Sequence, residues 1–243
     1  DDRGVAQDSW VHNSDKGTWK YYGDEEEPKL HTGWFEAVPS KELNSDDHEN
    51  GTTHWYYANS KGEITIPTAD GEVGVVKTID GKSYLFNSDG EMVTGLRILT
   101  YDGSKITNIS SEVDSADTVK NMNSDTMKLV YFESNGAAKT GTTTITLDGT
   151  SYTFSFKSNG SPRGVGETGI SDGYIYQNGL RLTADEDTKY GVVTYKNESY
   201  VVNEKGSIQK NKKNLKDADE TYYCTNAKGI LLHSSTEKCT TKH

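Results

Sequence analysis

A pattern that returns along the whole chain constrains its fold more than any other feature. An aromatic-rich segment is followed by two or three polar residues, a glycine and a short second segment, as in WYYANSKG at residues 55–62 and YLFNSDG at residues 84–90. Glycine adopts positive φ without steric cost, so each copy predicts a tight turn between two strands. Copies end at Gly62, Gly90, Gly136, Gly160, Gly179, Gly206 and Gly229, and a weaker copy spans residues 19–23.

A row of such hairpins has to stack to be stable. One hairpin alone is marginal in water, so we expect neighbouring copies to bury their alternate rings against each other. The expected fold is all-β, an elongated solenoid of stacked β-hairpin repeats with loop insertions at residues 39–50 and 110–117. We divide it into Trp-rich N-terminal hairpin repeats at residues 1–66 and Tyr-rich repeats at residues 67–243 that continue the same stack.

The composition excludes several classes of protein. Only 32% of the 243 residues are hydrophobic and 24 are glycine, which disfavours an all-helical bundle. The formal net charge is −11 and the basic residues form no stripe, so we expect no nucleic-acid partner. No stretch approaches the roughly 18 apolar residues of a membrane-spanning helix, so we expect no membrane insertion.

The start of the sequence and its two cysteines bear on the compartment. The sequence begins at Asp1 without Met, and we interpret it as a mature or excised segment, for which a missing leader does not argue against export. Cys224 and Cys239 are too few for a disulfide framework and lack metal-ligand spacing. Two alternatives stay open: one loop-closing bridge in an oxidising compartment, or two unrelated thiols.

One repeat carries a family resemblance. Residues 84–95, YLFNSDGEMVTG, resemble the cell-wall-binding repeats, also called choline-binding or glucan-binding repeats, of Gram-positive surface proteins. The family unit ends in Thr-Gly-Trp, and this chain has TGW at residues 32–34, TGL at 94–96 and TGT at 140–142. The resemblance implies a β-hairpin solenoid, secreted or on the cell surface, that binds a surface polymer and does not catalyse a reaction.

The departures from the family unit bear on the ligand. In choline-binding members, the resemblance implies a box in which the Trp after Thr-Gly holds a trimethylammonium group by cation–π attraction. Only Gly33 of this chain is followed by Trp, so we do not expect a regular array of such boxes. We favour a glucan polysaccharide, an α-glucan such as starch, bound by aromatic stacking. The alternatives are teichoic-acid choline or another wall polymer, and a structural spacer stalk that binds nothing.

The four tryptophans crowd the first quarter of the chain, whereas the fifteen tyrosines are spread along it. We predict a sugar-stacking surface there, with two histidines and a glutamate as partners for hydroxyl groups; the other interpretation is that these rings are core. Alternate residues of a strand face opposite sides, so residues 55–57 cannot all be core. The predicted ligand-binding residues are Trp10, Trp19, Trp34, Trp55, Tyr21, Tyr22, Tyr56, Tyr57, His31, His54 and Glu36.

No motif in the sequence predicts catalysis or a cofactor. There is no nucleophile elbow, zinc-protease motif or phosphate loop. His12, His31, His48 and His54 share their region with acidic residues but lack a ligand spacing, so we expect solvated histidines and no metal. Sequence spacing alone leaves open a pair of carboxylates for glycoside hydrolysis. The acidic runs at residues 24–27 and 46–47, however, are typical of solvated loops. We therefore expect no enzyme.

Overall fold

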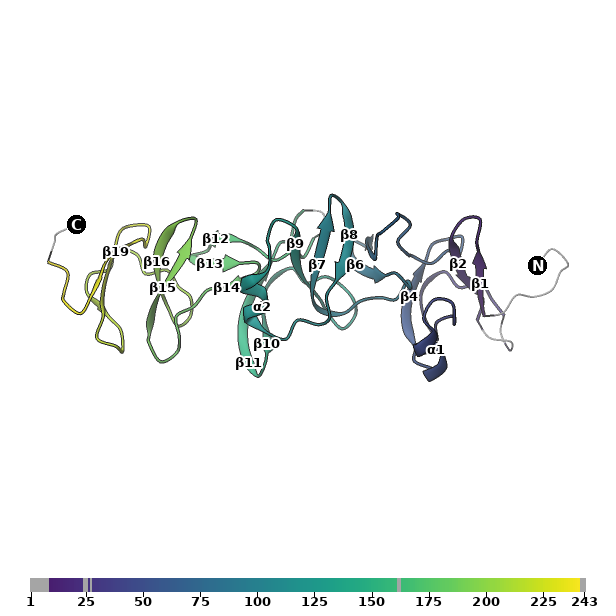
Figure 1. Ribbon diagram of the computed structural model, residues 1–243, viewed down its shortest axis with the longest axis horizontal. Coiled ribbons are helices and arrows are strands. Elements are labelled where there is room, and N and C mark those ends of the chain that lie inside the picture. The colour runs from purple at the N-terminus through teal and green to yellow at the C-terminus, as the bar shows by residue number, and fades with distance from the viewer. Residues whose placement is uncertain (1–8, 24–25, 27, 161–162, 241–243) are drawn as a thin grey trace. The chain divides into compact units, whose positions relative to one another are not determined.

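The computed structural model describes residues 9–23, 26, 28–160 and 163–240, and these are almost entirely strands, turns and loops (Figure 1). They fall into two compact units. Unit 1 holds the described parts of Asp1–Val113, Asn123–Lys139 and Asn159–Gly164. Unit 2 holds those of Asp114–Met122, Thr140–Ser158 and Val165–His243. Unit 1 spans residue 66, where the sequence suggested a division; the division into 1–66 and 67–243 stays a prediction.

Unit 1 contains a five-stranded sheet in the order β6-β5-β8-β7-β9 and two two-stranded sheets, β1-β2 and β3-β4, all antiparallel. Its helix α1 lies inside the insertion expected at residues 39–50. The elements are β1 (Trp10–Asn13), β2 (Thr18–Tyr21), β3 (Gly33–Ala37), α1 (Ser45–Asn50), β4 (His54–Ala58), β5 (Gly74–Ile79), β6 (Lys82–Asn87), β7 (Gly95–Asp102), β8 (Lys105–Ile109) and β9 (Met127–Phe132).

Unit 2 contains a five-stranded sheet in the order β10-β11-β14-β13-β12, a pair β15-β16 and a three-stranded sheet β17-β18-β19. The short helix α2 overlaps the end of the second expected insertion. The elements are α2 (Ala116–Asn121), β10 (Gly141–Leu147), β11 (Thr150–Phe156), β12 (Gly169–Ser171), β13 (Tyr174–Gln177), β14 (Leu180–Arg181), β15 (Tyr190–Tyr195), β16 (Glu198–Asn203), β17 (Leu215–Lys216), β18 (Tyr222–Thr225) and β19 (Leu231–Ser235).

The repeat of hairpins is confirmed, with one difference in pairing. The aromatic strand of a repeat pairs mainly with the strand before it, as β6 pairs with β5 across a two-residue turn at Asp80 and Gly81, both with positive φ. In several repeats the second strand expected after the repeat glycine is a single bridge, as between Phe86 and Met92. After Gly179 and Gly229 it is present as β14 and β19, which pair with the aromatic strands β13 and β18. The Met92 amide donates to the Trp55 carbonyl of the preceding repeat, so this segment is shared between two hairpins.

The turn of each repeat is held by its own polar residue and packs on the hairpin before it. The Asn87 side-chain oxygen accepts hydrogen bonds from the amides of Asp89 and Glu91, and Asn59, Asn203 and Asn226 do the same in their repeats. Five repeat glycines have positive φ and no room for a side chain, namely Gly62, Gly90, Gly136, Gly206 and Gly229. A Cβ on Gly90, for example, would lie 2.7 Å from Cδ1 of Ile64. Stacking of successive hairpins therefore depends on these glycines.

Aromatic side chains form much of the core, as the composition predicts. The core cluster of the N-terminal hairpins consists of Trp19, Phe35, Ala37, Tyr56, Ala58 and Ile64. A cluster in unit 2 consists of Ile175, Tyr200, Val202 and Ile208. Cys224 and Cys239 are joined by a disulfide, which decides between the two alternatives left open by the sequence. In the described part of the chain, no helix has both the length and the apolar character needed to cross a membrane.

Candidate ligand-binding site

The β3-β4 hairpin sorts the predicted ligand-binding residues onto two faces. Residues directly opposite in an antiparallel pair share a face. Trp34 lies opposite Tyr57, and Glu36 lies opposite Trp55, which places these four side chains on one face. Phe35 and its partner on β4 occupy the other face. We call these the outer and inner faces of the β3-β4 hairpin.

Several predicted residues pack against one another on the inner side. The Trp10 ring centroid lies 4.9 Å from the centroids of both Tyr21 and Tyr56, and the Trp10 indole donates to the Val38 carbonyl at 2.8 Å. Tyr21 stacks on Phe35 at 5.3 Å between centroids. Tyr56 has no exposed surface. The rings on the inner side thus pack mainly against one another.

Three further predicted residues lie around this cluster. His31 is half-buried, with its ring centroid 5.1 Å from that of Tyr21. Trp19 is buried, and its ring is stacked on the imidazole of His12 at 4.2 Å between centroids. Tyr22 is half-buried, and its amide donates to the Ser9 carbonyl. The structure therefore gathers most of the predicted rings, but around a core and not over one exposed surface.

On the outer face, Trp34 of β3 lies among rings from two other strands. Its centroid lies 5.1 Å from that of Tyr57 on β4 and 4.8 Å from that of Tyr84 on β6, and both contacts are edge-to-face. The ammonium of Lys77 lies 5.4 Å from the Tyr57 centroid. All four side chains are half-buried. We call Trp34, Tyr57 and Tyr84 the Trp34 site; its three side chains keep part of their surface exposed, and a cation already lies over the Tyr57 ring.

The other two outer-face residues form a second exposed feature. Trp55 is 45% exposed. Among the large apolar side chains of the described residues, Trp55 and Ile170 have the largest exposed fraction. The register partner of Trp55, Glu36, is also exposed, and the hydroxyl of Thr53 donates to the Glu36 carboxylate at 2.6 Å. A flat indole beside a carboxylate is a surface on which a sugar ring can stack and donate a hydroxyl hydrogen bond.

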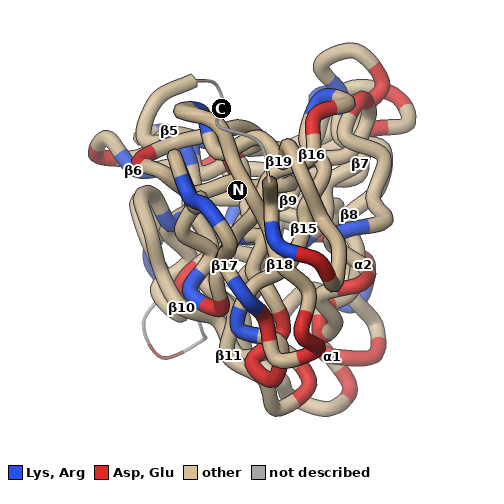
Figure 2. Tube along the Cα trace, turned by 90° about the vertical axis from the view of Figure 1, so that its left-hand side faces the viewer, with Lys and Arg blue, Asp and Glu red and all other residues tan. Residues whose placement is uncertain are grey.

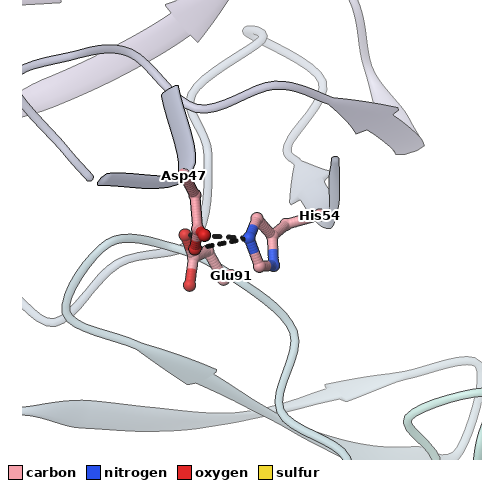
Figure 3. A group of neighbouring side chains, drawn as sticks. All are labelled: Asp47, His54 and Glu91. Carbon is pink, nitrogen blue, oxygen red and sulfur yellow. Dashed lines mark hydrogen bonds and ion pairs between the residues drawn. The ribbon is translucent and has the colours of Figure 1, made fainter. Parts of the chain in front are cut away.

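His54, predicted as a partner for sugar hydroxyls, lies instead among carboxylates. Its Nε2 atom lies 2.9 Å from Oδ2 of Asp47 and 3.7 Å from Oε1 of Glu91 (Figure 3). We call Asp47, His54 and Glu91 the Asp47 cluster. Its ligand atoms lie within 4.8 Å of one another. Asp47 belongs to α1, an acidic segment in Figure 2, which also holds Asp46 and Glu49.

In unit 2, rings that could hold a ligand are covered by the chain's own cations. The Arg181 guanidinium carbon lies 3.8 Å from the Tyr174 centroid, and Nη2 donates to the Tyr176 hydroxyl at 2.9 Å. The ammonium groups of Lys216 and Lys238 both lie 5.8 Å from the centroid of Tyr222. Lys77 lies over Tyr57 in the same way, so a nearby lysine alone does not distinguish the sites. The outer face of the β3-β4 hairpin is the better candidate because three rings from different strands meet there.

Sequence reasoning missed four of the residues that complete these sites. Tyr84 and Lys77 lie on the next hairpin, and they reach the Trp34 site only because successive hairpins stack. Asp47 and Glu91 come from the α1 insertion and from the turn after β6. A signal for Tyr84 existed, because it opens the repeat at residues 84–95 that most resembles the family. No spacing rule links His54 to either carboxylate.

Comparison with known proteins identifies the class of fold. No protein-family model matches the chain, and no curated protein sequence matches it. Among solved structures, the chain is similar to CbpF in complex with ipratropium, with 20% identity, 93% of this chain and 60% of that chain covered, and a TM-score of 0.53. A crystal form of choline binding protein F from Streptococcus pneumoniae gives 19% identity, 93% and 48% coverage, and a TM-score of 0.37.

The choline-binding domain of CbpL from Streptococcus pneumoniae is also similar, with 14% identity, 93% of this chain and 98% of that chain covered, and a TM-score of 0.45. The chain spans about 60% of the length of CbpF in the first match. The match to CbpF, with its TM-score of 0.53, shows a shared fold. At the level of the fold, this confirms the resemblance seen at residues 84–95.

Proposed function

We propose that this chain is a non-catalytic module that attaches a protein to the bacterial cell wall by binding choline or a similar quaternary ammonium group at the Trp34 site. The observation that carries the proposal is the convergence of three rings from different strands on one half-buried position. Aromatic faces arranged around a cation bind it through their ring quadrupoles, and tryptophan does so best.

The chain's own cation supports this choice of ligand over a neutral sugar at the Trp34 site. The Lys77 ammonium already lies 5.4 Å from the Tyr57 ring centroid, so the ring faces a positive charge in the free protein. A trimethylammonium group is larger and more weakly hydrated than an ammonium, so it loses less hydration free energy when it moves from water into the site. The proposal therefore departs from the α-glucan favoured by the sequence and adopts the choline alternative.

The fold supports the proposed partner and location. The structures with which the fold is shared include CbpF in complex with ipratropium. We infer that the partner is a wall polymer carrying choline, such as a teichoic acid, and that the module acts outside a Gram-positive cell. No catalytic role is proposed for any residue of the Trp34 site.

Titration with choline tests the proposal. Choline chloride is added to the full chain, and tryptophan fluorescence and binding heat are recorded. We expect saturable binding that is weakened at least tenfold in Trp34→Ala and in Tyr84→Ala, since each removes a ring that borders the site. The matched control is Trp55→Ala, which removes an exposed indole from the same face and should bind as the unmodified chain does.

Two results would overturn this function. One is the absence of choline binding at millimolar concentration by a folded chain. The other is unchanged binding in a Trp34→Ala protein whose circular dichroism is that of the parent. If Trp34→Ala does not fold, Trp34→Phe replaces it, because a smaller ring keeps the packing and should weaken binding less than tenfold but measurably.

A second candidate function is supported by the exposed pair Trp55 and Glu36. This pair suits stacking of a sugar ring, so a glucan such as starch could be bound here. Affinity electrophoresis in gels containing starch, dextran or β-glucan tests it: retardation should occur with one glucan and be lost in Trp55→Ala but kept in Trp34→Ala. No retardation by any of the three glucans would dismiss it, whatever the outcome with choline.

A further inference from the structure

The Asp47 cluster unites three ligand atoms of the kinds that bind zinc. Zinc binds imidazole nitrogen and carboxylate oxygen at about 2.0–2.2 Å in a tetrahedron, which places ligand atoms about 3.4 Å apart. The distances from His54 Nε2 to Asp47 Oδ2 and to Glu91 Oε1 are 2.9 Å and 3.7 Å, on either side of that spacing. In Figure 3 the two carboxylates approach the same imidazole nitrogen from one side.

The two carboxylates are held in place by a second set of side chains. Nδ2 of Asn44, the residue that caps α1, donates to Asp47 at 2.8 Å and to Glu91 at 2.9 Å. Nδ2 of Asn87 donates to the other oxygen of Glu91 at 2.8 Å. Such outer contacts orient metal ligands in known sites. The cluster is therefore built, and it is not a chance approach of flexible surface groups.

The negative charge of the cluster exceeds its positive charge. Among the described residues, His54 is the one basic side chain within 4.0 Å of the Asp47 and Glu91 carboxylates. Asp89 lies in the same turn as Glu91, where its amide is held by Asn87, and adds a further carboxylate to this segment. A divalent cation would offset this excess.

An unpartnered buried hydroxyl beside the cluster is an independent observation. Tyr56 lies two residues after His54 on β4, on the same face of the strand, and has no exposed surface. Its hydroxyl makes no hydrogen bond among the described residues. A buried hydroxyl without a partner, on the face of β4 that carries His54, is a group whose hydrogen bonding a metal-bound water would complete.

We propose that Asp47, His54 and Glu91 bind a divalent transition-metal ion of the zinc class, with water in the fourth position. Imidazole nitrogen favours such ions over calcium or magnesium. Asp47 and His54 are about one-third and one-quarter exposed, so the ion and its water can reach the site from solvent. On binding, the proton at Nε2 moves to Nδ1 or leaves to solvent, and each carboxylate contributes one oxygen.

A metal here would tie together three parts of unit 1. Asp47 belongs to α1, His54 begins β4, and Glu91 belongs to the turn after β6. The α1 insertion has no buried residue of its own in the helix, so packing contributes little to its attachment. We infer a structural role in which the ion fixes the α1 insertion against two successive repeats.

Calorimetric titration of the untagged, chelator-treated chain with zinc chloride tests the site. We expect one Zn²⁺ per chain, a zinc-dependent rise in the thermal midpoint, and affinity lowered at least tenfold in Glu91→Gln and in His54→Gln. The matched control is His12→Gln, because His12 lies 3.9 Å from the Glu42 carboxylate but has no third ligand. It should bind zinc as the parent does.

A measurement on the unmodified chain keeps the proposal testable if a variant fails to fold. Imidazole nitrogen resonances of the six histidines are followed during zinc addition, with the His54 signal assigned independently. We expect Nε2 of His54 to shift with the same midpoint as the calorimetric curve. The proposal is overturned if the chain binds no zinc, if the His54 resonances do not move, or if folded Glu91→Gln binds zinc unchanged.

Discussion

The guanidinium of Arg181 covers the face of the Tyr174 ring at 3.8 Å and donates to the Tyr176 hydroxyl at 2.9 Å. In this repeat the chain supplies its own cation to a pair of rings. At the Trp34 site, the ammonium of Lys77 lies farther from its ring, at 5.4 Å from the Tyr57 centroid. Cation–ring contacts within the chain thus occur in both units, and the contact in unit 2 is the shorter of the two.

Replacing Arg181 should destabilise the chain. Arg181→Met keeps part of the aliphatic stem but loses the contact with Tyr174 and the hydrogen bond to Tyr176, which together contribute about 1–2 kcal/mol. Urea unfolding measures the difference. The control is Lys205→Met, because Lys205 is exposed at a turn and its replacement should change the free energy of unfolding by less than about 0.5 kcal/mol. If Arg181→Met and Lys205→Met are equally stable, the contacts of Arg181 with Tyr174 and Tyr176 do not stabilise the chain.

Replacing Lys77 should strengthen binding of free choline at the Trp34 site. The Lys77 ammonium repels a second cation in the site, and Lys77→Met removes that charge while keeping an aliphatic side chain over Tyr57. For partly exposed charges the repulsion is about 0.5–1 kcal/mol, or roughly two- to fivefold in affinity. Choline titration measures it, with the exposed Lys61→Met as control. Weaker choline binding in Lys77→Met would show that the lysine assists the ligand.

The repeat glycines and the alternation of residues could be predicted from the sequence, because both are local. Positive φ at Gly62, Gly90 and Gly136 follows from the turn chemistry, and the parity argument holds: Trp55 is 45% exposed whereas Tyr56 has no exposed surface. Which neighbour a strand pairs with was less predictable. The turn at residues 80–81 joins β6 to β5, the strand before it. The sequence repeat begins at the aromatic residue of β6 and therefore does not include β5.

The sites depend on contacts between repeats, which a linear pattern does not encode. Trp34 meets Tyr84, and His54 meets Glu91, only after the hairpins have stacked. The sequence also suggested that His31 and His54 are equivalent partners for a ligand. In the structure His31 packs on Tyr21, whereas His54 lies beside two carboxylates, because the α1 insertion folds back onto β4.

A methyl group at Gly136 should destabilise the chain more than the same change at Gly81. Both glycines have positive φ, so both substitutions carry the strain of that conformation, about 1–2 kcal/mol. A Cβ at Gly136 would also overlap Sδ of Met92 from the preceding hairpin, whereas nothing lies within 4 Å of a Cβ at Gly81. Overpacking adds about 1–3 kcal/mol. Urea unfolding of Gly136→Ala and Gly81→Ala measures the difference, and adding Met92→Ala should recover part of the loss only at Gly136.

Removing the disulfide should weaken the last hairpins. Cys224 and Cys239 are separated by 15 residues, and closing a loop of that length restricts the unfolded chain by about 3 kcal/mol. The double variant Cys224→Ser, Cys239→Ser should unfold at lower urea concentration than the oxidised parent. A reductant should lower the stability of the parent to that of the variant and leave the variant unchanged. If a reductant leaves the stability of the parent unchanged, the stabilising role of the Cys224–Cys239 disulfide is contradicted.

The Tyr101 hydroxyl should make the chain sensitive to alkali. Burial raises the pKa of Tyr101 to about 12 in the folded chain, against about 10 in the unfolded chain, and the hydroxyl has no hydrogen-bond partner among the described residues. Between these values the unfolded chain binds fewer protons than the folded chain. Stability is therefore full below about pH 10 and falls as pH rises toward 12.

Replacing Tyr101 with Phe isolates that contribution. At neutral pH Tyr101→Phe should change the free energy of unfolding by less than about 0.5 kcal/mol, because no hydrogen bond is lost and an unpaired buried hydroxyl is removed. Between about pH 9 and 11 the variant should lose less stability than the parent, although Tyr56 and Tyr223 still contribute to the decline because their pKa values are raised as well. Urea unfolding at several pH values compares the two slopes. Parallel slopes would mean that the Tyr101 hydroxyl titrates alike in the folded and unfolded chains.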